Sequence, residues 1–502
     1  MSVPDPDMSS RVMVFLKRTL AEITSKQVHT PNFEKYVEAI KALNSLQSNA
    51  NVIQEARNRM LNGTSKQFNN VDTTLKYIKR IGLPLEELES RIIHISGTKG
   101  KGSTAIMTEA LLRNAPYKTG LFLSPHITSV RERIMINGIP LSQKLFIDYF
   151  WSVFDVLSQN KDNETDMPSY FKFLTIMALK VFISEKVDVA VIEVGIGGEL
   201  DCTNVFQKTP VVGITSIGLD HTRLLGDTVE KIAWQKAGIM KPGCLAFTVP
   251  DQSSSVLQVF QKRAKEKECR FEVVPNLSEY SIDHERFNYP QRLNASLAIQ
   301  LSKAWTIWNN NGSHSDYNRI EISQDQEKVL LSCQIPGRCH VLRENGNKLC
   351  YYLDGAHTVE SMEVAKNWFQ ETSSKNALRI LIFNVTGGRS PISLLKMLVD
   401  CQFSEAIFCT NCISEKEDDL PEDLVSKGTC LEEAINKAKE NLNAWKSLGG
   451  SSGHVVTSVA NAILLAQQLS NCRSTSVLFT GSLHLVGSAL FLLRPNNDST
   501  IE

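Results

Sequence analysis

The chain has 502 residues, in which 54 Lys and Arg residues balance 54 Asp and Glu residues. This length exceeds the size at which one hydrophobic core keeps growing, so we expect two or three domains. The balanced charge argues against a nucleic-acid binder that works through a large basic field, and a hydrophobic content of 42% is that of an ordinary globular protein.

The first 34 residues form an N-terminal extension of ambiguous type. They contain the Ser, Arg and Lys residues of an amphipathic targeting segment, but Asp5, Asp7 and Glu22 do not suit one. The chain has no secretory signal and no apolar run of the roughly 18 residues that span a bilayer. Its eleven cysteines are scattered, which indicates a reducing compartment. We therefore expect the protein in the cytoplasm, the mitochondrion or both.

Short apolar runs alternate with helical patterns between residues 91 and 250. Several of these runs are almost continuously apolar, as strands covered by helices on both faces should be. This pattern predicts a doubly wound parallel α/β sheet. The runs are 91–96, 119–124, 187–195, 210–217 and 244–249.

A second alternating series begins after Pro336, behind the polar stretch 309–328. We therefore predict an N-terminal α/β domain over 35–335 and a smaller Rossmann-like α/β domain over 336–502. The Gly- and Ser-rich segment 447–454 is expected to be a mobile surface loop. The strand-like runs of the second series are 350–356, 377–385, 406–410 and 477–483.

The segment 91–104 changes from an apolar strand pattern to the turn GTKGKGST and then to a helical pattern. Its glycines, Gly97, Gly100 and Gly102, can adopt backbone angles closed to other residues. Successive N–H groups can then point at one anion, while Lys101 supplies a cation. The spacing is compressed relative to the common P-loop motif, so a flexible connection is the alternative. We predict that this loop binds a nucleoside triphosphate, so that the domain over 35–335 is a P-loop ATP-binding domain.

Polar residues follow three of the predicted strands, at the sheet edge where open parallel sheets bind ligands. A buried carboxylate needs a pairing cation, hydrogen bonds or a metal, and the phosphate loop makes Mg²⁺ the natural candidate. A structural salt bridge is the alternative for Glu193, and an ordinary polar position is the alternative for His221. The residues concerned are Glu193, Asp220, His221, Asp354 and His357.

The segment 226–240 predicts a helix from Val229, with Asp227 and Glu230 resembling a capping box. Lys236 falls on the apolar stripe of this helix. A lysine on a buried face must be paired, neutralised or chemically altered, because burying an isolated ammonium is prohibitive. The alternative is a side chain whose amine reaches water along the surface.

Motifs in both predicted domains together closely resemble folylpolyglutamate synthase, a family of the Mur ligase superfamily. They occur in family order between about residues 35 and 495, and Thr358 with TGSLHLVG is similar to the eukaryotic branch. The compressed phosphate loop is the form that this family uses. The motifs are GTKGKGST, SPH (124–126), VIEVGIGG, LDHTRLLGDTVEKIAWQKAGI, RLNASLAIQL (292–301), PGR (336–338), YLDGAHT and VLFTGSLHLVG.

The resemblance implies an ADP-forming carboxylate–amine ligase. ATP would phosphorylate the terminal glutamate carboxylate of a reduced folate, and L-glutamate would attack the acyl phosphate to form a γ-linked amide. Such polyglutamylation retains folates in the cell for one-carbon metabolism. Loose phosphoryl transfer of this kind needs cations around the γ-phosphate more than it needs a protein nucleophile. The implied partners are small molecules only, with no nucleic acid and no membrane segment, and we expect a monomer.

The resemblance also implies the nucleotide-binding residues. Lys101 and the loop amides would hold the β and γ phosphates, and Asn294 would contact the nucleotide. Arg338 and Asp354 would reach ATP from the hinge and the second domain, and closure of that domain would exclude water. The full loop set is Gly97, Thr98, Lys99, Gly100, Lys101, Gly102, Ser103 and Thr104.

Two Mg²⁺ sites are implied in the same way. Ser124 and Glu193 would bind one ion, and Glu193, His221 and Lys236 would bind the second. Lys236 would be carried as a carbamate made with CO₂, which explains a lysine on an apolar stripe. A monovalent cation is a further candidate cofactor. The residues assigned to catalysis are Lys101, Lys236, Arg338 and His357.

The folate side is less defined. His126 stands at a position that is aromatic in some bacterial relatives. Tyr170, Phe171 and Phe173 either line a folate pocket or belong to the core.

Two alternative functions remain. A nucleotide-dependent switch would have a P-loop, but the chain lacks a guanine-specific N-K-x-D element. Attachment of glutamate to dihydropteroate is an activity that bacterial relatives sometimes share.

Overall fold

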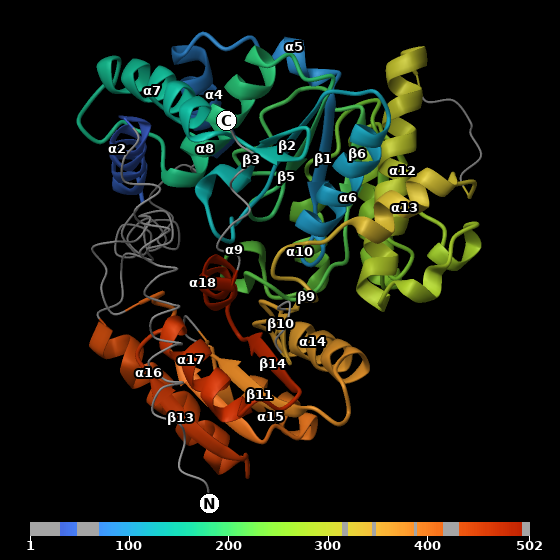
Figure 1. Ribbon diagram of the computed structural model, residues 1–502. Coiled ribbons are helices and arrows are strands. Elements are labelled where there is room, and N and C mark those ends of the chain that lie inside the picture. The colour runs from blue at the N-terminus through green and yellow to red at the C-terminus, as the bar shows by residue number, and fades with distance from the viewer. Residues whose placement is uncertain are drawn as a thin grey trace, which may run out of the picture. The chain divides into compact units, whose positions relative to one another are not determined.

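The structure is a computed structural model that describes residues 31–47, 70–313, 320–343, 348–385, 389–414 and 431–493. The chain divides into two compact α/β units (Figure 1). We call Glu38–His126 with Arg131–Cys333 the N-terminal unit. The C-terminal unit contains the described residues of Gln334–Glu502, together with Ile127–Val130 and the described residues up to Val37. Residues 1–30 of the predicted extension lie outside the described part, and the domain limits 35–335 and 336–502 stay a prediction.

The N-terminal unit contains an eight-stranded sheet in the order β4-β3-β2-β5-β1-β6-β7-β8. The strands from β2 to β8 along this order run parallel, and β3 and β4 add an antiparallel hairpin at one edge. All five strands predicted here are confirmed, but the short β3, β4 and β8 were not predicted. The strands are β1 (Ile92–Ser96), β2 (Thr119–Phe122), β3 (Ile134–Ile136), β4 (Ile139–Pro140), β5 (Val189–Glu193), β6 (Val211–Ile214), β7 (Leu245–Thr248) and β8 (Arg270–Val273).

Helices cover both faces of this sheet, as the doubly wound prediction requires (Figure 1). Ile93 and Ile95 of β1 pack with α6 (Lys101–Asn114) and α12 (Tyr289–Asn311) on one face. On the other face, α10 (Val229–Ala237) and α11 (Ser254–Glu266) pack on β6 and β7, while α8 contacts Gly120 through Phe182. The remaining helices are α2 (Pro31–Ser45), α4 (Asn70–Arg80), α5 (Glu86–Glu89), α7 (Gln143–Gln159), α8 (Tyr170–Ser184), α9 (Thr222–Leu225) and α13 (Gln324–Ser332).

The C-terminal unit contains a six-stranded sheet in the order β13-β12-β11-β14-β10-β9, in which only β9 is antiparallel to its neighbour. Helices α17 and α18 pack on one face, and α14, α15 and α16 on the other. The elements are β9 (His340–Arg343), β10 (Leu349–Leu353), α14 (Val359–Thr372), β11 (Leu378–Phe383), α15 (Pro391–Leu398), β12 (Glu405–Cys409), α16 (Leu431–Ser447), β13 (Ser452–Val456), α17 (Val459–Ser470), β14 (Thr475–Thr480) and α18 (Leu483–Leu493).

The prediction of a mobile loop over 447–454 is wrong in its second half. Residues Ser452–Val456 form β13, which pairs in parallel with β12. Glycine is used here for close packing rather than for freedom, because a Cβ at Gly453 would lie 2.5 Å from the Leu442 side chain of α16. His454 Nε2 also lies 3.1 Å from a carboxylate oxygen of Glu405 on β12. Among the described helices, none combines the length and the apolar character that are needed to cross a bilayer.

Candidate active site

The predicted phosphate loop connects the end of β1 to the start of α6. Gly97 and Gly100 have φ angles of +145° and +91°, which other residues rarely adopt. The N–H groups of Thr98 and Lys99 donate to the carbonyl oxygen of Ser216, at 2.9 and 3.3 Å, so the end of β6 holds the loop. The N-terminus of the 14-residue α6 therefore follows directly from a fixed glycine turn, which is the geometry of an anion site.

The prediction that Gly102 is needed for an unusual backbone angle is wrong. This glycine lies within the first turn of α6 and has no positive φ angle. A Cβ at this position would sit 3.3 Å from Oε2 of Glu193. The position therefore needs a small residue because the Glu193 carboxylate lies against the helix, and not because of its backbone angle. Lys101 and Glu193 thus belong to one small region.

Glu193 is the last residue of β5 and is only 4% exposed. The backbone N–H of Ser124, just after β2, donates to its Oε2 at 2.9 Å. Strands β2 and β5 are neighbours in the sheet, so their carboxyl ends bring Ser124 and Glu193 together, as predicted. A buried carboxylate oxygen beside a phosphate loop matches the hard oxygen ligands that Mg²⁺ takes alongside phosphate oxygens.

Lys236 lies on α10 and is 3% exposed. Its Nζ donates to the carbonyl oxygen of Gly97 at 2.6 Å, so it contacts the phosphate loop directly. Burial, and next to it the Lys101 ammonium, lower the pKa of Lys236 to about 7. No carboxylate lies within ion-pair distance of Lys236 in the part of the chain that the structure describes. The amine is therefore buried, and the alternative of an amine that reaches water is wrong.

The helix that carries Lys236 is capped differently from the prediction. Thr228 is the N-cap, and its hydroxyl accepts from the N–H of Lys231. Asp227 lies one residue earlier and forms an exposed ion pair with Lys231 at 2.8 Å. The predicted N-cap, Asp227, is one residue before the observed one, because Asp and Thr both suit an N-cap.

His221 precedes α9 in a left-handed conformation with a φ angle of +49°. Its side chain is 46% exposed, and its Nε2 lies 3.9 Å from Oδ2 of Asp220. Asp220 is close enough to act on the pKa of Lys236, where it opposes the lowering by burial and by Lys101. The loop after β6 therefore approaches Lys236 through Asp220, and the ligand role of His221 stays a prediction.

Asn294 comes from α12 and is 7% exposed. Its Oδ1 accepts from the Thr104 hydroxyl at 3.3 Å, and its side chain lies against Gly100. The structure thus brings Lys101, Glu193, Lys236 and Asn294 to one loop, although they are far apart in sequence.

The C-terminal unit contains the remaining candidates around the carboxyl end of β10. Asp354 is 6% exposed and accepts from the N–H groups of Cys339 and Ala356, at 2.8 and 2.9 Å. Burial raises the pKa of Asp354, and the charge of Arg338 opposes this rise. His357 places Nδ1 2.8 Å from the carbonyl oxygen of Gly355, which fixes the ring and makes Nδ1 the protonated nitrogen.

No group of three or more His, Cys, Asp or Glu side chains with metal-site geometry occurs among the described residues. Mg²⁺ commonly takes one or two carboxylates and completes its shell with phosphate oxygens and water.

No protein-family model matches this chain, but proteins of similar sequence are known. A Bos taurus protein named folylpolyglutamate synthase, mitochondrial, is 41% identical over 76% of this chain and 69% of its own length. The Homo sapiens protein of the same name is 36% identical over 93% of this chain and 92% of its own. The chain belongs to the folylpolyglutamate synthase family.

The fold of the family is also found in solved structures. The Mycobacterium tuberculosis folylpolyglutamate synthase complexed with ADP has a TM-score of 0.67 and 22% identity, and the match covers 87% of this chain and 97% of that one. This likeness supports the two-sheet α/β fold. Both sheets described above therefore belong to the fold of this family.

Sequence reasoning missed two buried charged residues of this region. Asp201 is 7% exposed, and its carboxylate accepts from the N–H groups of Ile196 and Thr203, at 3.0 and 2.9 Å. Arg133 is 9% exposed, and its carbonyl oxygen accepts from the N–H of Leu123, the residue before Ser124. The signal for Arg133 is a charged residue directly before the apolar run IMI of β3.

The aromatic candidates separate in the structure. Phe173 is fully buried and its ring lies 5.1 Å from that of Phe150, so core packing is confirmed for this residue. Phe171 stacks on Phe122 of β2, with ring centroids 5.7 Å apart. Tyr170 instead faces the guanidinium of Arg133.

Proposed function

We propose that this chain is an ATP-dependent, ADP-forming ligase. It adds L-glutamate through γ-linked amide bonds to tetrahydrofolate and its polyglutamates. The observation that carries the proposal is the convergence of the phosphate loop, Glu193 and Lys236 in a chain of the folylpolyglutamate synthase family. The names of the relatives support the same activity here.

The N-terminus of α6 and the loop before it bind the ATP phosphates. The amides of the glycine turn and the helix dipole favour negative charge, and Lys101 adds a mobile cation that can follow the γ-phosphate as it transfers. Asn294 borders the loop and contacts the nucleotide. The γ-carboxylate of the folate attacks the γ-phosphate, ADP leaves, and the amine of L-glutamate then displaces phosphate from the acyl phosphate.

Glu193 and Ser124 would hold one Mg²⁺, and Glu193, His221 and Lys236 would hold a second. When bound, these ions neutralise charge on the transferring phosphoryl group. The Glu193 carboxylate is buried next to the phosphate loop and accepts the N–H of Ser124, and this placement of a carboxylate oxygen beside the phosphates supports the role.

Lys236 acts as a carbamate. Its neutral amine attacks CO₂ and loses a proton, so that a buried cation is replaced by an anionic oxygen ligand. Two features support the reaction: the amine is buried without a carboxylate partner, and burial lowers the pKa of Lys236 to about 7. A substantial neutral fraction therefore exists near neutral pH, whereas an ordinary lysine is almost fully protonated there.

The cluster at the end of β10 serves the same reaction. Arg338 and Asp354 contact ATP, and His357 lies near the transferred phosphate. Their support is the fixed geometry of the cluster, in which Asp354 and His357 are held by backbone hydrogen bonds. Mutation of Arg338 or His357 should therefore lower turnover without unfolding the C-terminal unit.

The substrates are small molecules, and the protein acts as a monomer, with a monovalent cation as a further candidate cofactor. We propose mitochondrial and cytoplasmic locations. The bovine and human relatives carry the word mitochondrial in their names, which supports the first of these.

The decisive experiment incubates the protein with ATP, Mg²⁺, tetrahydrofolate and labelled L-glutamate. The expected products grow by one glutamate at a time with matching ADP release. ATP hydrolysis without folate-dependent incorporation would favour the nucleotide switch instead. A parallel reaction with dihydropteroate tests the second alternative, and we expect no incorporation there.

A further inference from the structure

Arg133 is a buried guanidinium with little protein compensation. It ends the 3₁₀ helix η1 (Val130–Arg133) and its side chain is 9% exposed. Its Nε–H donates to Nδ1 of His126 at 2.9 Å, and its guanidinium carbon lies 5.4 Å from the ring centroid of Tyr170. Both contacts orient the guanidinium plane but leave the Nη donors for another acceptor.

No carboxylate lies within ion-pair distance of Arg133 among the described residues. Two other arginines of the same unit, whose side chains are 10% and 6% exposed, behave differently. Arg80 bonds Asp166 at 2.8 Å, and Arg263 bonds Glu199 at 2.7 Å. Because burying an unpaired charge is costly, Arg133 is the exception that calls for an anion supplied from outside the chain.

Arg133 lies at the edge of the proposed active site. Its carbonyl oxygen accepts from the N–H of Leu123, and the next residue, Ser124, donates its own N–H to Glu193. Burial lowers the pKa of Arg133, and electrostatic interactions with Tyr170, Glu193 and Glu132 oppose this effect. Glu193 is therefore near enough for its charge to reach the guanidinium, although it does not pair with it.

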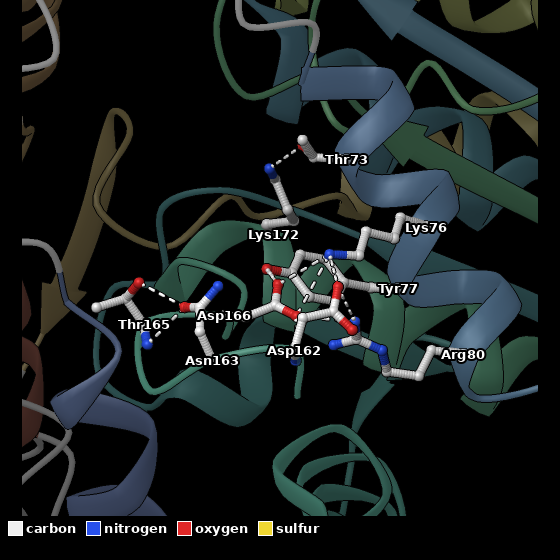
Figure 2. Close-up of polar contacts among 9 residues, drawn as sticks. All are labelled: Thr73, Lys76, Tyr77, Arg80, Asp162, Asn163, Thr165, Asp166 and Lys172. Atoms are coloured by element: carbon white, nitrogen blue, oxygen red, sulfur yellow. Dashed lines mark hydrogen bonds and ion pairs between the residues drawn. The ribbon is translucent and has the colours of Figure 1, made fainter. Parts of the chain in front are cut away.

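The surroundings of Arg133 are rigid. Tyr170 begins α8, and the segment before it is fixed to α4, as Figure 2 shows. There Asp166 accepts from Arg80 at 2.8 Å and from the Tyr77 hydroxyl at 3.0 Å. Lys172 of α8 donates to Thr73 of α4 at 2.5 Å. Tyr170, whose ring lies under the guanidinium, is thus flanked in sequence by two residues, Asp166 and Lys172, that are bonded to α4.

We propose that Arg133 binds the α-carboxylate of the terminal glutamate of the folate substrate, and that this contact directs the γ-carboxylate to ATP. The inference rests on the proposed function. A terminal glutamate presents two carboxylates of similar chemistry, so a ligase that makes only γ-linked products must hold the α-carboxylate apart. A planar guanidinium with free Nη donors suits a carboxylate better than a lysine would, because it can bind both oxygens.

The test compares two ligands that differ only in this group: pteroylglutamate, and its analogue with γ-aminobutyrate in place of glutamate, which lacks the α-carboxylate. We expect the wild-type protein to bind pteroylglutamate roughly 10- to 100-fold more tightly, the usual size of a charge-assisted contact. Arg133→Met should lose this preference by weakening only pteroylglutamate. Equilibrium binding by fluorescence titration measures it without requiring turnover.

Arg131→Met is the matched control. It removes the same charge from the same turn, but Arg131 uses its Nη1 to bond the carbonyl oxygen of Leu141 at 3.0 Å. It should keep the preference for pteroylglutamate. Thermal melting and ADP binding establish that each variant is folded, and Arg133→Lys, which keeps the charge without the planar fork, takes the place of Arg133→Met if the latter unfolds.

The outcomes separate the two proposals. Undiminished preference in a folded Arg133 variant, or equal weakening of both ligands, overturns the α-carboxylate contact while leaving the ligase intact. Binding of neither ligand by the wild-type protein overturns the proposed function, and the contact with it. In turnover assays the Arg133 variants should raise KM for the folate far more than they lower kcat, and γ-linked products should remain dominant only in the wild-type and Arg131→Met proteins.

Discussion

Asn294 of α12 occupies the space next to Gly100 of the phosphate loop. A Cβ on Gly100 would lie 2.2 Å from the Asn294 Oδ1 atom, well inside contact distance. The loop and the helix are therefore fitted to each other, so a change at Gly100 reaches both the backbone turn and a nucleotide-facing side chain.

Gly100→Ala should weaken ATP binding at least roughly 10-fold, because the new methyl group displaces Asn294 and the residue must keep a φ angle of +91°. Isothermal titration with ADP measures the loss. Gly218→Ala is the control, since a Cβ at this nearby glycine meets nothing within 4 Å. Equal affinities of the two variants would contradict the role given to the Gly100–Asn294 contact.

Glu193→Gln should lower turnover at least roughly 100-fold and raise the Mg²⁺ concentration needed for half-maximal activity. The amide has nearly the same shape and can still accept the Ser124 N–H, so the fold should persist. The measurement is a Mg²⁺ titration of ADP release at saturating ATP. An unchanged Mg²⁺ dependence would remove Glu193 from the metal site and leave a structural role.

Lys236→Ala should abolish turnover while keeping the fold, because the small residue cannot form the carbamate. Bicarbonate should not rescue it, but a small carboxylate such as acetate should restore part of the activity by occupying the vacated space. In the wild-type protein, activity should fall after removal of CO₂ and return when bicarbonate is added. Full activity of Lys236→Ala would exclude this lysine from the mechanism.

Much of the fold and part of the site could be predicted from the sequence. Most of the buried parallel strands are almost continuously apolar, so each stands out without its neighbours. Strand β8 has the sequence RFEV with both ends exposed, and β13 begins in a Gly- and Ser-rich segment. Only pairing with β7 and β12 makes strands of them, and pairing is a property of distant residues.

The same limit applies to the site. Lys236 could be singled out because one charge interrupts a helical apolar stripe. For Arg133 the sequence offers only a charge before the apolar run IMI. That its guanidinium is buried without a carboxylate partner among the described residues becomes visible only when the neighbours His126 and Tyr170 are in place. The reason for Gly102, the approach of Glu193 from another strand, was hidden in the same way.

The charge cluster around Asp166 should give the N-terminal unit an acid-sensitive contribution to stability. The N–H of Asp162 contributes most to holding the pKa of Asp166 well below its usual range, and hydrogen bonds from Arg80, Tyr77 and Lys76 act in the same direction against the effect of burial. Because the folded-state pKa is lowered, the contribution is complete above about pH 5 and declines as the pH falls through the unfolded value of about 3.9 toward the folded one.

Asp166→Asn should therefore destabilise the protein by roughly 2 kcal/mol near neutral pH and by somewhat less near about pH 3, where the folded-state carboxylate is still ionised, as measured by urea unfolding. The control is Asp148→Asn, whose ion pair with Lys144 at 2.7 Å is solvent-exposed on both sides. That change should cost less than about 0.5 kcal/mol at either pH. A destabilisation by Asp166→Asn that does not shrink in acid would mean that the residue acts through packing rather than through its charge.

Because Tyr170 follows this cluster and faces Arg133, the same variant should also weaken folate binding, which links the stability of the segment to the substrate side of the site.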